Sequence, residues 1–395
     1  MKKYYPRKIE KELQKQVNSE EIVVLTGMRR TGKSMIMRHI FDSIDSSNKI
    51  YLDLENILNR KIFEEENYDN IWSNLLPLGI SKDQKCYIFL DEIQFMRNIP
   101  SVIKYLFDNF EVKFFLTGSS SYYLKNLFSE SLSGRKFIFE LFPLDFEEYL
   151  WFREKKKIFG KTFIDKEKSR NKIQSVLYEK DYAEYLEFGG FPPVVLEKDF
   201  DRKLKKINDI FTSYFELDVK TLADFRNISK FRDLIILLSA RCGSKVEITK
   251  LASELQVSRE TVYNYLAFLE QTYFITLLRP YTKNSDREVS GAKKVYFCDN
   301  GMLKLLGGVS AGAIFENAVF NNLKNYKQIN YYQRRAGAEI DFVIDKKIGL
   351  EVKSRGSKAY LDKAKKIAEK IGLVETYVVS KDYVSEEGMI SAVDL

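Results

Sequence analysis

The first part of the chain alternates short apolar runs with longer stretches of helical periodicity. The runs are continuous in their hydrophobicity, which is typical of strands that are buried on both faces. The segments between the first four runs are long enough for crossover helices, so the pattern predicts an α/β domain with a parallel sheet. The predicted strands are residues 21–27, 49–54, 85–92, 112–118 and 136–141.

The pattern changes after Pro143, where the chain becomes helical and charged. It predicts a helical region punctuated by a turn at Gly189 and Gly190. Residues 246–281 then predict a winged helix-turn-helix, because apolar residues repeat at helical spacing, Ser258 is placed to cap a second helix, and "YFITLLRPY" follows as a wing strand. Such a module either contacts DNA or serves as a packing element.

The last part returns to mixed structure. It predicts a helix over "GAIFENAVFNNLKNY", two strands over "AEIDFVID" and "IGLEVKS", and an amphipathic helix over "AYLDKAKKIAEKIG". These changes of pattern divide the chain into an N-terminal α/β domain, a helical lid region, a winged helix-turn-helix and a C-terminal α/β domain. The predicted boundaries are 1–143, 144–245, 246–285 and 286–395.

Composition narrows the possible chemistry. No segment approaches the ~18 uninterrupted apolar residues of a membrane span, and the N-terminus lacks the apolar core of a signal peptide, so we expect no membrane partner. Cys86, Cys242 and Cys298 form no CxxC pair, which favours a reducing cytoplasm over a disulfide framework or a zinc site. His39 is the only histidine, so acid–base and metal chemistry must rest mainly on carboxylates and lysines.

The formal net charge of +8 is unevenly distributed. Residues 151–180 carry 10 Lys or Arg against 4 Asp or Glu. Clustered charge of this kind is either a solvated helix face or a contact with nucleic acid.

The stretch "GMRRTGKS", residues 27–34, matches GxxxxGK[ST] between a predicted strand and a predicted helix. In this context the backbone N–H groups face phosphates, Lys33 reaches the β- and γ-phosphates of ATP, and Ser34 offers its hydroxyl to Mg²⁺. The alternative is a fortuitous glycine turn. The candidate nucleotide contacts in this loop are Gly27, Arg29, Arg30, Thr31, Gly32, Lys33, Ser34 and Met35.

The third predicted strand ends in Asp91 and Glu92. Asp91 is a candidate Mg²⁺ carboxylate, and Glu92 is a candidate base that orients water on the γ-phosphate. Thr117 and Ser119 end the next strand and are candidate γ-phosphate sensors. Arg135 is either a surface arginine or a group that neutralises transition-state charge, in its own subunit or in a second copy of a homo-oligomer.

These residues resemble a known group. The stretches "GMRRTGKS", "YIFLDEIQ", "LTGSSS", "LSGR", "FELFPLDFEEYL" and "EFGGFPPVV" resemble archaeal and bacterial P-loop ATPases of the AAA+/STAND kind, whose C-terminal half is a domain of unknown function. The resemblance continues through the C-terminal half. It implies that the Gly-x-Pro turn ending at Pro192 approaches the nucleotide base.

The stretch "GAEIDFVIDKKIGLEVKSRG" predicts a hairpin. Pairing Ile344 with Ile348 leaves a three-residue loop and places Asp341 opposite Glu351. Two adjacent carboxylates repel each other unless a cation or Lys353 compensates for their charge. In the chemical interpretation, Asp341 and Glu351 hold Mg²⁺, and Lys353 orients or activates the attacking water.

A helix glutamate, Glu316, is the natural fourth member of this set. A helix followed by an Asp strand and a Glu-x-Lys strand resembles the PD-(D/E)XK, or restriction-endonuclease-like, nuclease core, in which some members keep the fold without cleaving. The sequence therefore favours a Mg²⁺-dependent ATPase whose nucleotide state controls a DNA-binding and possible DNA-cleaving domain. The alternative is a STAND-type regulatory switch with a catalytically silent recognition domain. Asp299, at a strand end, is expected to cap a turn.

Overall fold

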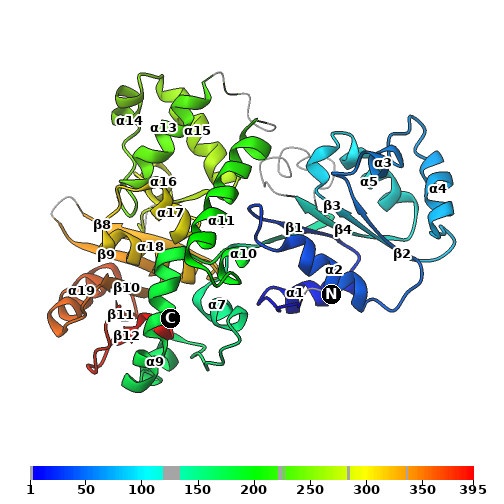
Figure 1. The fold of residues 1–395 in the computed structure, drawn as a ribbon. Helices are drawn as coiled ribbons and strands as arrows, with labels where there is room; N and C mark the ends of the chain where they lie inside the picture. The colour runs from blue at the N-terminus through cyan, green and yellow to red at the C-terminus, as the bar shows by residue number, and fades with distance from the viewer. Residues whose placement is uncertain (1–2, 119–133, 221–224, 226, 283–284, 335–336) are drawn as a thin grey trace. The chain divides into compact units, whose positions relative to one another are not determined.

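The computed structural model describes residues 3–118, 134–220, 225, 227–282, 285–334 and 337–395. The chain forms two compact units (Figure 1). The first contains Met1–Phe142, Ser213–Ala223 and Gln271–Tyr273, and the second contains Pro143–Thr212, Asp224–Glu270 and Phe274–Leu395. The chain therefore passes between the units several times. The finer division into four domains stays a prediction.

The first unit is built on a five-stranded sheet in the order β2-β3-β4-β1-β5 (Figure 1). Every neighbouring pair of strands is parallel, which confirms the sheet predicted from the apolar runs. The strands are β1 (Ile22–Thr26), β2 (Lys49–Asp53), β3 (Cys86–Asp91), β4 (Val112–Gly118) and β5 (Lys136–Glu140).

The two faces of this sheet bury separate cores. On one face, Val23 and Phe115 pack with α2 (Lys33–Ser43) and with Leu13 of α1 (Glu10–Lys15). On the other, alternate residues such as Val24 pack with α4 (Asn70–Leu75) and α5 (Ile99–Asn109), while α3 (Ile57–Lys61) lies earlier in the same segment. Burial of each large apolar side chain contributes roughly 1.5–3 kcal/mol. Burial on both faces explains why these strands are continuously apolar.

The second unit begins with helices, as predicted after Pro143. These are α7 (Phe146–Phe152), α8 (Phe163–Lys168), α9 (Lys172–Phe188), α10 (Pro192–Val195), α11 (Phe200–Ser213) and α13 (Ile228–Ser239). The predicted pair of helices follows as α14 (Ile248–Leu255) and α15 (Arg259–Gln271). The Ser258 hydroxyl accepts a hydrogen bond from the Thr261 N–H at 3.0 Å, as the sequence predicted for a cap. The next strand, β6 (Ile275–Leu278), pairs antiparallel with β7 (Lys294–Phe297).

The C-terminal sheet has the order β12-β11-β10-β9-β8. It contains β8 (Ile329–Gln333), β9 (Glu339–Ile344), β10 (Ile348–Lys353), β11 (Glu375–Ser380) and β12 (Met389–Ser391). In the hairpin of β9 and β10, Ile344 lies opposite Ile348, which confirms the predicted register. Helix α19 (Lys358–Ile371) contacts β9, β10 and β11, while α18 (Ala311–Leu323) contacts β10 and β7. Two shorter helices, α16 (Ser285–Ser290) and α17 (Asn300–Leu306), precede α18.

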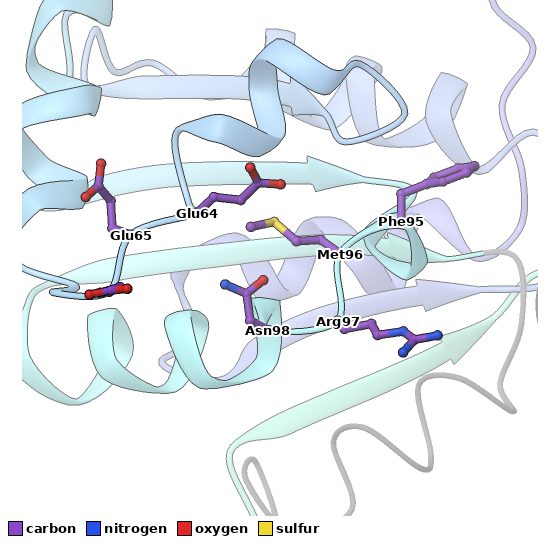
Figure 2. A pocket seen from close by; sticks show the side chains of 7 residues that line it. Glu64, Glu65, Phe95, Met96, Arg97 and Asn98 are labelled. Atoms are coloured by element: carbon purple, nitrogen blue, oxygen red, sulfur yellow. The ribbon is translucent and has the colours of Figure 1, made fainter.

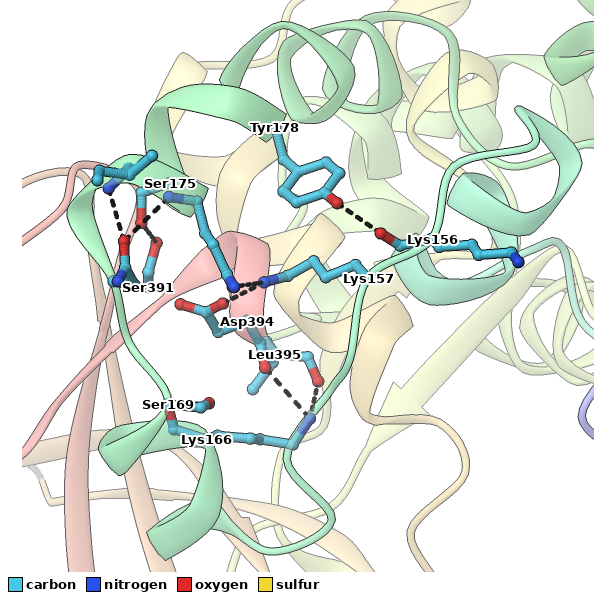
Figure 3. A network of polar contacts seen from close by, with 12 residues as sticks. Lys156, Lys157, Lys166, Ser169, Ser175, Tyr178, Ser391, Asp394 and Leu395 are labelled. Carbon is cyan, nitrogen blue, oxygen red and sulfur yellow. Dashed lines mark hydrogen bonds and ion pairs between the residues drawn. The ribbon is translucent and has the colours of Figure 1, made fainter.

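Three lysines of the basic segment 151–180 are used inside the second unit. Lys155 pairs with Asp181 at 2.6 Å. Lys157 pairs with Asp394 at 2.6 Å (Figure 3). The Lys157 and Asp394 side chains are 1% and 3% exposed, and Lys166 donates to the backbone oxygen of Leu395. Lys157 and Lys166 therefore tie the segment after α7 and helix α8 to the residues that follow β12, while Lys155 is paired with α9. These pairings differ from both a solvated face and a nucleic-acid contact. Within the described residues, no helix is both long enough and apolar enough to cross a membrane.

Candidate nucleotide site and carboxylate cluster

The phosphate-binding loop lies between β1 and α2, which begins at Lys33. Gly27 has a φ of +148°, and a Cβ atom there would lie 2.1 Å from the carbonyl oxygen of Leu141. Only glycine fits such a close approach of two backbone segments. Gly32, with a φ of +102°, turns the chain into the helix. The loop residues Arg30 and Met35 are exposed, and Ser34 is half-buried.

Lys33 is buried inside this loop. Its Nζ atom donates hydrogen bonds to the carbonyl oxygens of Gly27 at 2.9 Å and Met28 at 3.1 Å. Burial lowers the pKa of Lys33, although the charges of Glu92, Asp218 and Asp91 act in the opposite direction. The ammonium group is therefore held by neutral carbonyl groups and attracted by nearby carboxylates. An anionic phosphate would supply the full charge partner that those carbonyls do not.

The predicted Asp91, Glu92 and Thr117 come together at the carboxyl edge of the sheet. Asp91 is buried, and its carboxylate accepts hydrogen bonds from the Tyr51 hydroxyl at 2.6 Å and from the Thr117 hydroxyl. The Glu92 N–H donates to the Thr117 hydroxyl oxygen at 3.1 Å. Glu92 adopts the left-handed conformation with a φ of 55°, and its carboxylate accepts from Gln94. Tyr51 was missed because its proximity depends on the order of the strands.

Two further residues bind the loop from distant parts of the sequence. Arg29 Nε lies 3.1 Å from each carboxylate oxygen of Asp218, and the two side chains are 12% and 3% exposed. Asp218 belongs to the short π-helix Tyr214–Val219, which is part of the first unit. Arg7 is buried and donates to the carbonyl oxygen of Thr31 at 2.9 Å and to that of Phe142 at 2.8 Å. Sequence spacing carries no signal for contacts of this range.

Arg135 is not brought together with Lys33. Its carbonyl oxygen accepts from the N–H of Ile22, the first residue of β1, so Arg135 lies at the amino edge of the parallel sheet. The phosphate-binding loop follows the opposite end of β1. The Arg135 side chain instead pairs with Asp108 at 2.9 Å, with 40% of its area exposed.

The remaining two predicted nucleotide residues are Ser119 and Pro192. Ser119 lies outside the described residues. Pro192 is the first residue of α10 in the second unit. The turn before it is held by Asp299, whose carboxylate accepts from the Gly190 N–H at 2.6 Å and from the Met302 N–H at 3.1 Å. Asp299 thus caps the helix α17, where the sequence predicted a turn cap, and burial raises its pKa to about 6.

The second unit gathers the four residues of the predicted nuclease-like set around buried ion pairs. Asp341 is buried, and its Oδ2 atom accepts from the N–H of Val352 at 2.7 Å. Lys353 Nζ lies 2.7 Å from Glu351 Oε1 and 3.7 Å from Asp341 Oδ2. Burial raises the pKa of Glu351 to about 7, and the charge of Asp341 adds to this effect. Burial also raises the pKa of Asp341.

Two residues of β7 complete the cluster. Tyr296 donates its hydroxyl to Glu316 Oε1 at 2.6 Å. Lys294 Nζ lies 2.7 Å from Glu339 Oε1 and 3.8 Å from Glu316 Oε1. Burial raises the pKa of Glu316 to about 7, with the charge of Asp341 as the next cause. In the sequence, the sign that β7 contributes to the cluster was that Lys294 and Tyr296, two residues apart, place two polar groups on the same face of a strand.

The carboxylates are thus interleaved with ammonium groups. Among the described residues, no three His, Cys, Asp or Glu side chains are grouped closely enough to hold a metal ion. One feature still fits a cation, because Glu351 Oε2 is buried and has no hydrogen-bond partner in the described part of the chain. Carboxylate oxygens are also the donor type that Mg²⁺ takes. The carboxylate oxygens are therefore suitable ligands for a metal ion. However, Lys294 and Lys353 already neutralise much of the negative charge of these carboxylates.

A separate cavity of about 450 Å³ lies in the first unit (Figure 2). It is bordered by the segment after α3 and by the loop that follows β3. Its lining residues are Glu64, Glu65, Glu66, Phe95, Met96, Arg97 and Asn98. None of the residues singled out from the sequence lines it.

Comparisons with known families divide the chain into three parts. Residues 19–150 match the family described as AAA domain. Residues 179–312 and 311–390 match two domains of unknown function, DUF8612 and DUF4143. The first match supports a P-loop ATPase and therefore nucleotide binding. The descriptions of the other two families name no activity.

Full-length relatives are also similar to most of the chain. An uncharacterized protein of Methanocaldococcus jannaschii is 28% identical over 351 residues, which cover 85% of this chain and 75% of the relative. An uncharacterized protein of Haemophilus influenzae is 26% identical over 344 residues, or 83% of this chain and 80% of the relative.

Among solved structures, a STAND protein with a tetratricopeptide repeat sensor from Pyrococcus horikoshii is 15% identical with a TM-score of 0.31. The match covers 94% of this chain and 48% of that one. The PCH-2 protein of C. elegans is 14% identical with a TM-score of 0.25, over 67% of this chain and 64% of that one.

Proposed function

We propose that the first unit binds and hydrolyses ATP with Mg²⁺, and that its nucleotide state controls the second unit. The observation that carries this proposal is the meeting of Lys33, Asp91, Glu92 and Thr117 at one edge of the sheet, within the segment that matches an AAA domain. Lys33 binds the β- and γ-phosphates and Ser34 contributes its hydroxyl to Mg²⁺. Asp91 serves the same ion, and Glu92 orients the attacking water.

The remaining nucleotide residues have secondary roles in this proposal. Thr117 and Ser119 sense the γ-phosphate, and Pro192 approaches the base. Arg135 acts in trans, as part of a homo-oligomer. Its side chain is partly exposed and lies at the edge of the sheet away from its own Lys33, which supports a role toward a second copy.

We further propose that the second unit is a winged helix-turn-helix followed by a PD-(D/E)XK-like domain that acts on DNA. Helices α14 and α15 with β6 supply the first element, and α18 with the β9–β10 hairpin supplies the second. Asp341 and Glu351 would hold a divalent cation, which would polarise a phosphodiester. Glu316 and Lys353 would position the carboxylates and the water. The unpartnered Glu351 Oε2 is the observation that favours this role.

The second candidate function is a STAND-type switch in which this domain recognises a ligand without cutting it. The pairing of Lys353 with Glu351 and of Lys294 with Glu339 favours this alternative, because it neutralises the carboxylates without a metal ion.

The two functions are separated by a cleavage assay. Purified full chain is incubated with supercoiled, linear and single-stranded DNA, with Mg²⁺ or Mn²⁺, and with or without ATP. Cleavage that disappears in Asp341→Asn would establish the nuclease, and its loss in Lys33→Ala would place it under control of the ATPase. DNA left intact in every condition, with ATP still hydrolysed, would leave the switch. An absence of ATP binding would overturn the proposal for the first unit.

A further inference from the structure

Lys294 is an unusual residue to find inside a domain. It lies on β7, outside the hairpin, and only 3% of its area is exposed. Its ammonium group lies 2.7 Å from Glu339 Oε1, 3.8 Å from Glu316 Oε1 and 5.3 Å from the centre of the Tyr331 ring. Burial of a lysine is costly unless its charge is compensated. Here the compensation comes from several carboxylates at once.

The charges around Lys294 favour its protonated form. Burial acts to lower its pKa, but the charges of Glu316, Asp341 and Glu339 outweigh burial and raise it. Lys294 therefore stays protonated in the cluster. In the same cluster, Lys353 pairs with Glu351 and lies 3.7 Å from Asp341. Two ammonium groups thus face carboxylates that, without them, would require some other cation.

We propose that Lys294 is a built-in cation of this cluster: its ammonium group holds Glu316 and Glu339 together beside Asp341 without a metal ion, and a divalent cation binds only by displacing it. This inference rests on the metal site proposed above and adds its regulation. Wild-type protein then binds a divalent cation weakly at Asp341 and Glu351, because the charge of the neighbouring Lys294 opposes a second cation until Lys294 withdraws from Glu339. Any change that withdraws Lys294 strengthens the binding.

The first test measures Mn²⁺ binding to the full chain by isothermal titration calorimetry. Lys294→Met keeps the length and apolar stem of the side chain and removes its charge. We expect it to bind Mn²⁺ about tenfold more tightly than wild type or better, a change that needs only about 1.4 kcal/mol of relief. Mn²⁺ should also raise the Tm of this variant more than that of wild type.

Lys245→Met is the matched control. Lys245 pairs with Lys294 through the backbone, and its Nζ atom lies 5.8 Å from the centre of the same Tyr331 ring. Its replacement should leave the Mn²⁺ affinity unchanged. Adding Asp341→Asn to Lys294→Met should abolish the gain, and a gain that persists would mean that the ion binds elsewhere and would overturn the inference.

A second measurement uses wild-type protein and does not depend on how the variant folds. Amine acetylation followed by mass spectrometry reports the accessibility of each lysine. Mn²⁺ should increase the labelling of Lys294 and leave that of Lys245 unchanged. Calorimetric Mn²⁺ binding without this increase, or with equal affinity in wild type and Lys294→Met, would refute displacement while keeping the metal site. No binding to either folded protein would reject both.

Discussion

The two candidate sites each contain a buried lysine, but the groups around the two lysines differ. Lys33 is held by neutral backbone carbonyls, and burial lowers its pKa. Lys294 is held by carboxylates, and their charge raises its pKa. Among the described residues, the first ammonium group has no carboxylate within ion-pair distance, whereas the second already has one. The same side chain therefore prepares one site to receive an anionic ligand and leaves the other neutralised before any cation arrives.

The largest effect is expected at the first site, where Lys33 is proposed to bind ATP. Lys33→Ala should weaken ATP binding by more than about 100-fold. The variant loses the proposed hydrogen bonds from the Lys33 ammonium group to the β- and γ-phosphates, each of which contributes about 1.5–3 kcal/mol. Fluorescent-nucleotide titration measures the affinity, and the exposed Lys11→Ala serves as the control. Retained ATP affinity in a folded Lys33→Ala protein would contradict the role of this loop.

The next effect concerns the ion pair that borders Lys33. Asp218→Ala leaves the Arg29 guanidinium buried without its closest carboxylate, so the free energy of unfolding should fall by roughly 3–5 kcal/mol. Denaturant unfolding of wild type, both single variants and the double variant with Arg29→Met measures the coupling. The double variant should lose less than the sum of the singles. Additive losses would show that the two side chains do not interact.

At the second site, we expect the free energy of unfolding to depend on pH. Glu316 and Glu351 have folded-state pKa values of about 7, above the usual glutamate value of ~4.3, so the folded state binds more protons between these values. The contribution of these two groups to stability should therefore be greatest below about pH 4.3 and fall as the pH rises toward 7, by at most about 1.4 kcal/mol per pH unit for each group. Thermal unfolding from pH 5 to 8 measures this slope. Glu316→Gln should reduce it, and an unchanged slope would argue against these protons.

The smallest expected effect lies at Arg135. Its partly exposed pair with Asp108 contributes about 0.2–1 kcal/mol, so Arg135→Ala should change stability and ATP affinity little. If Arg135 acts on a second copy, the rate of ATP hydrolysis per chain should rise with protein concentration in wild type and stay flat in the variant. A phosphate-release assay over a range of protein concentrations distinguishes these cases.

The sequence predicted the features that depend on local pattern. Continuous apolar runs located the five strands of the first unit, and a three-residue loop fixed the register of Ile344 with Ile348. Alternation failed where the pairing of β8 with β9 contains a bulge, between Asn330 and Tyr332. On the same strand, Ile340 and Val343 pack in one cluster, although strict alternation would place them on opposite faces.

Contacts between distant segments were beyond the reach of spacing. Tyr51, Asp218 and Lys294 reach their sites through strand order and tertiary packing. The position of Arg135 is a different case. A residue that directly precedes a parallel strand lies at the amino edge of the sheet, so the predicted strand 136–141 already implied that Arg135 lies away from its own phosphate-binding loop.

The first unit is built from three separate segments of the chain, and this limits how it can be exchanged by recombination between genes. Its three segments, Met1–Phe142, Ser213–Ala223 and Gln271–Tyr273, are separated by stretches of the second unit. A single crossover after residue 142 would transfer the phosphate-binding loop with Arg29 but leave Asp218 behind. The first unit is therefore inherited with the chain that surrounds it, and a chimera of two relatives joined at this point would set the arginine of one parent against the residue at position 218 of the other.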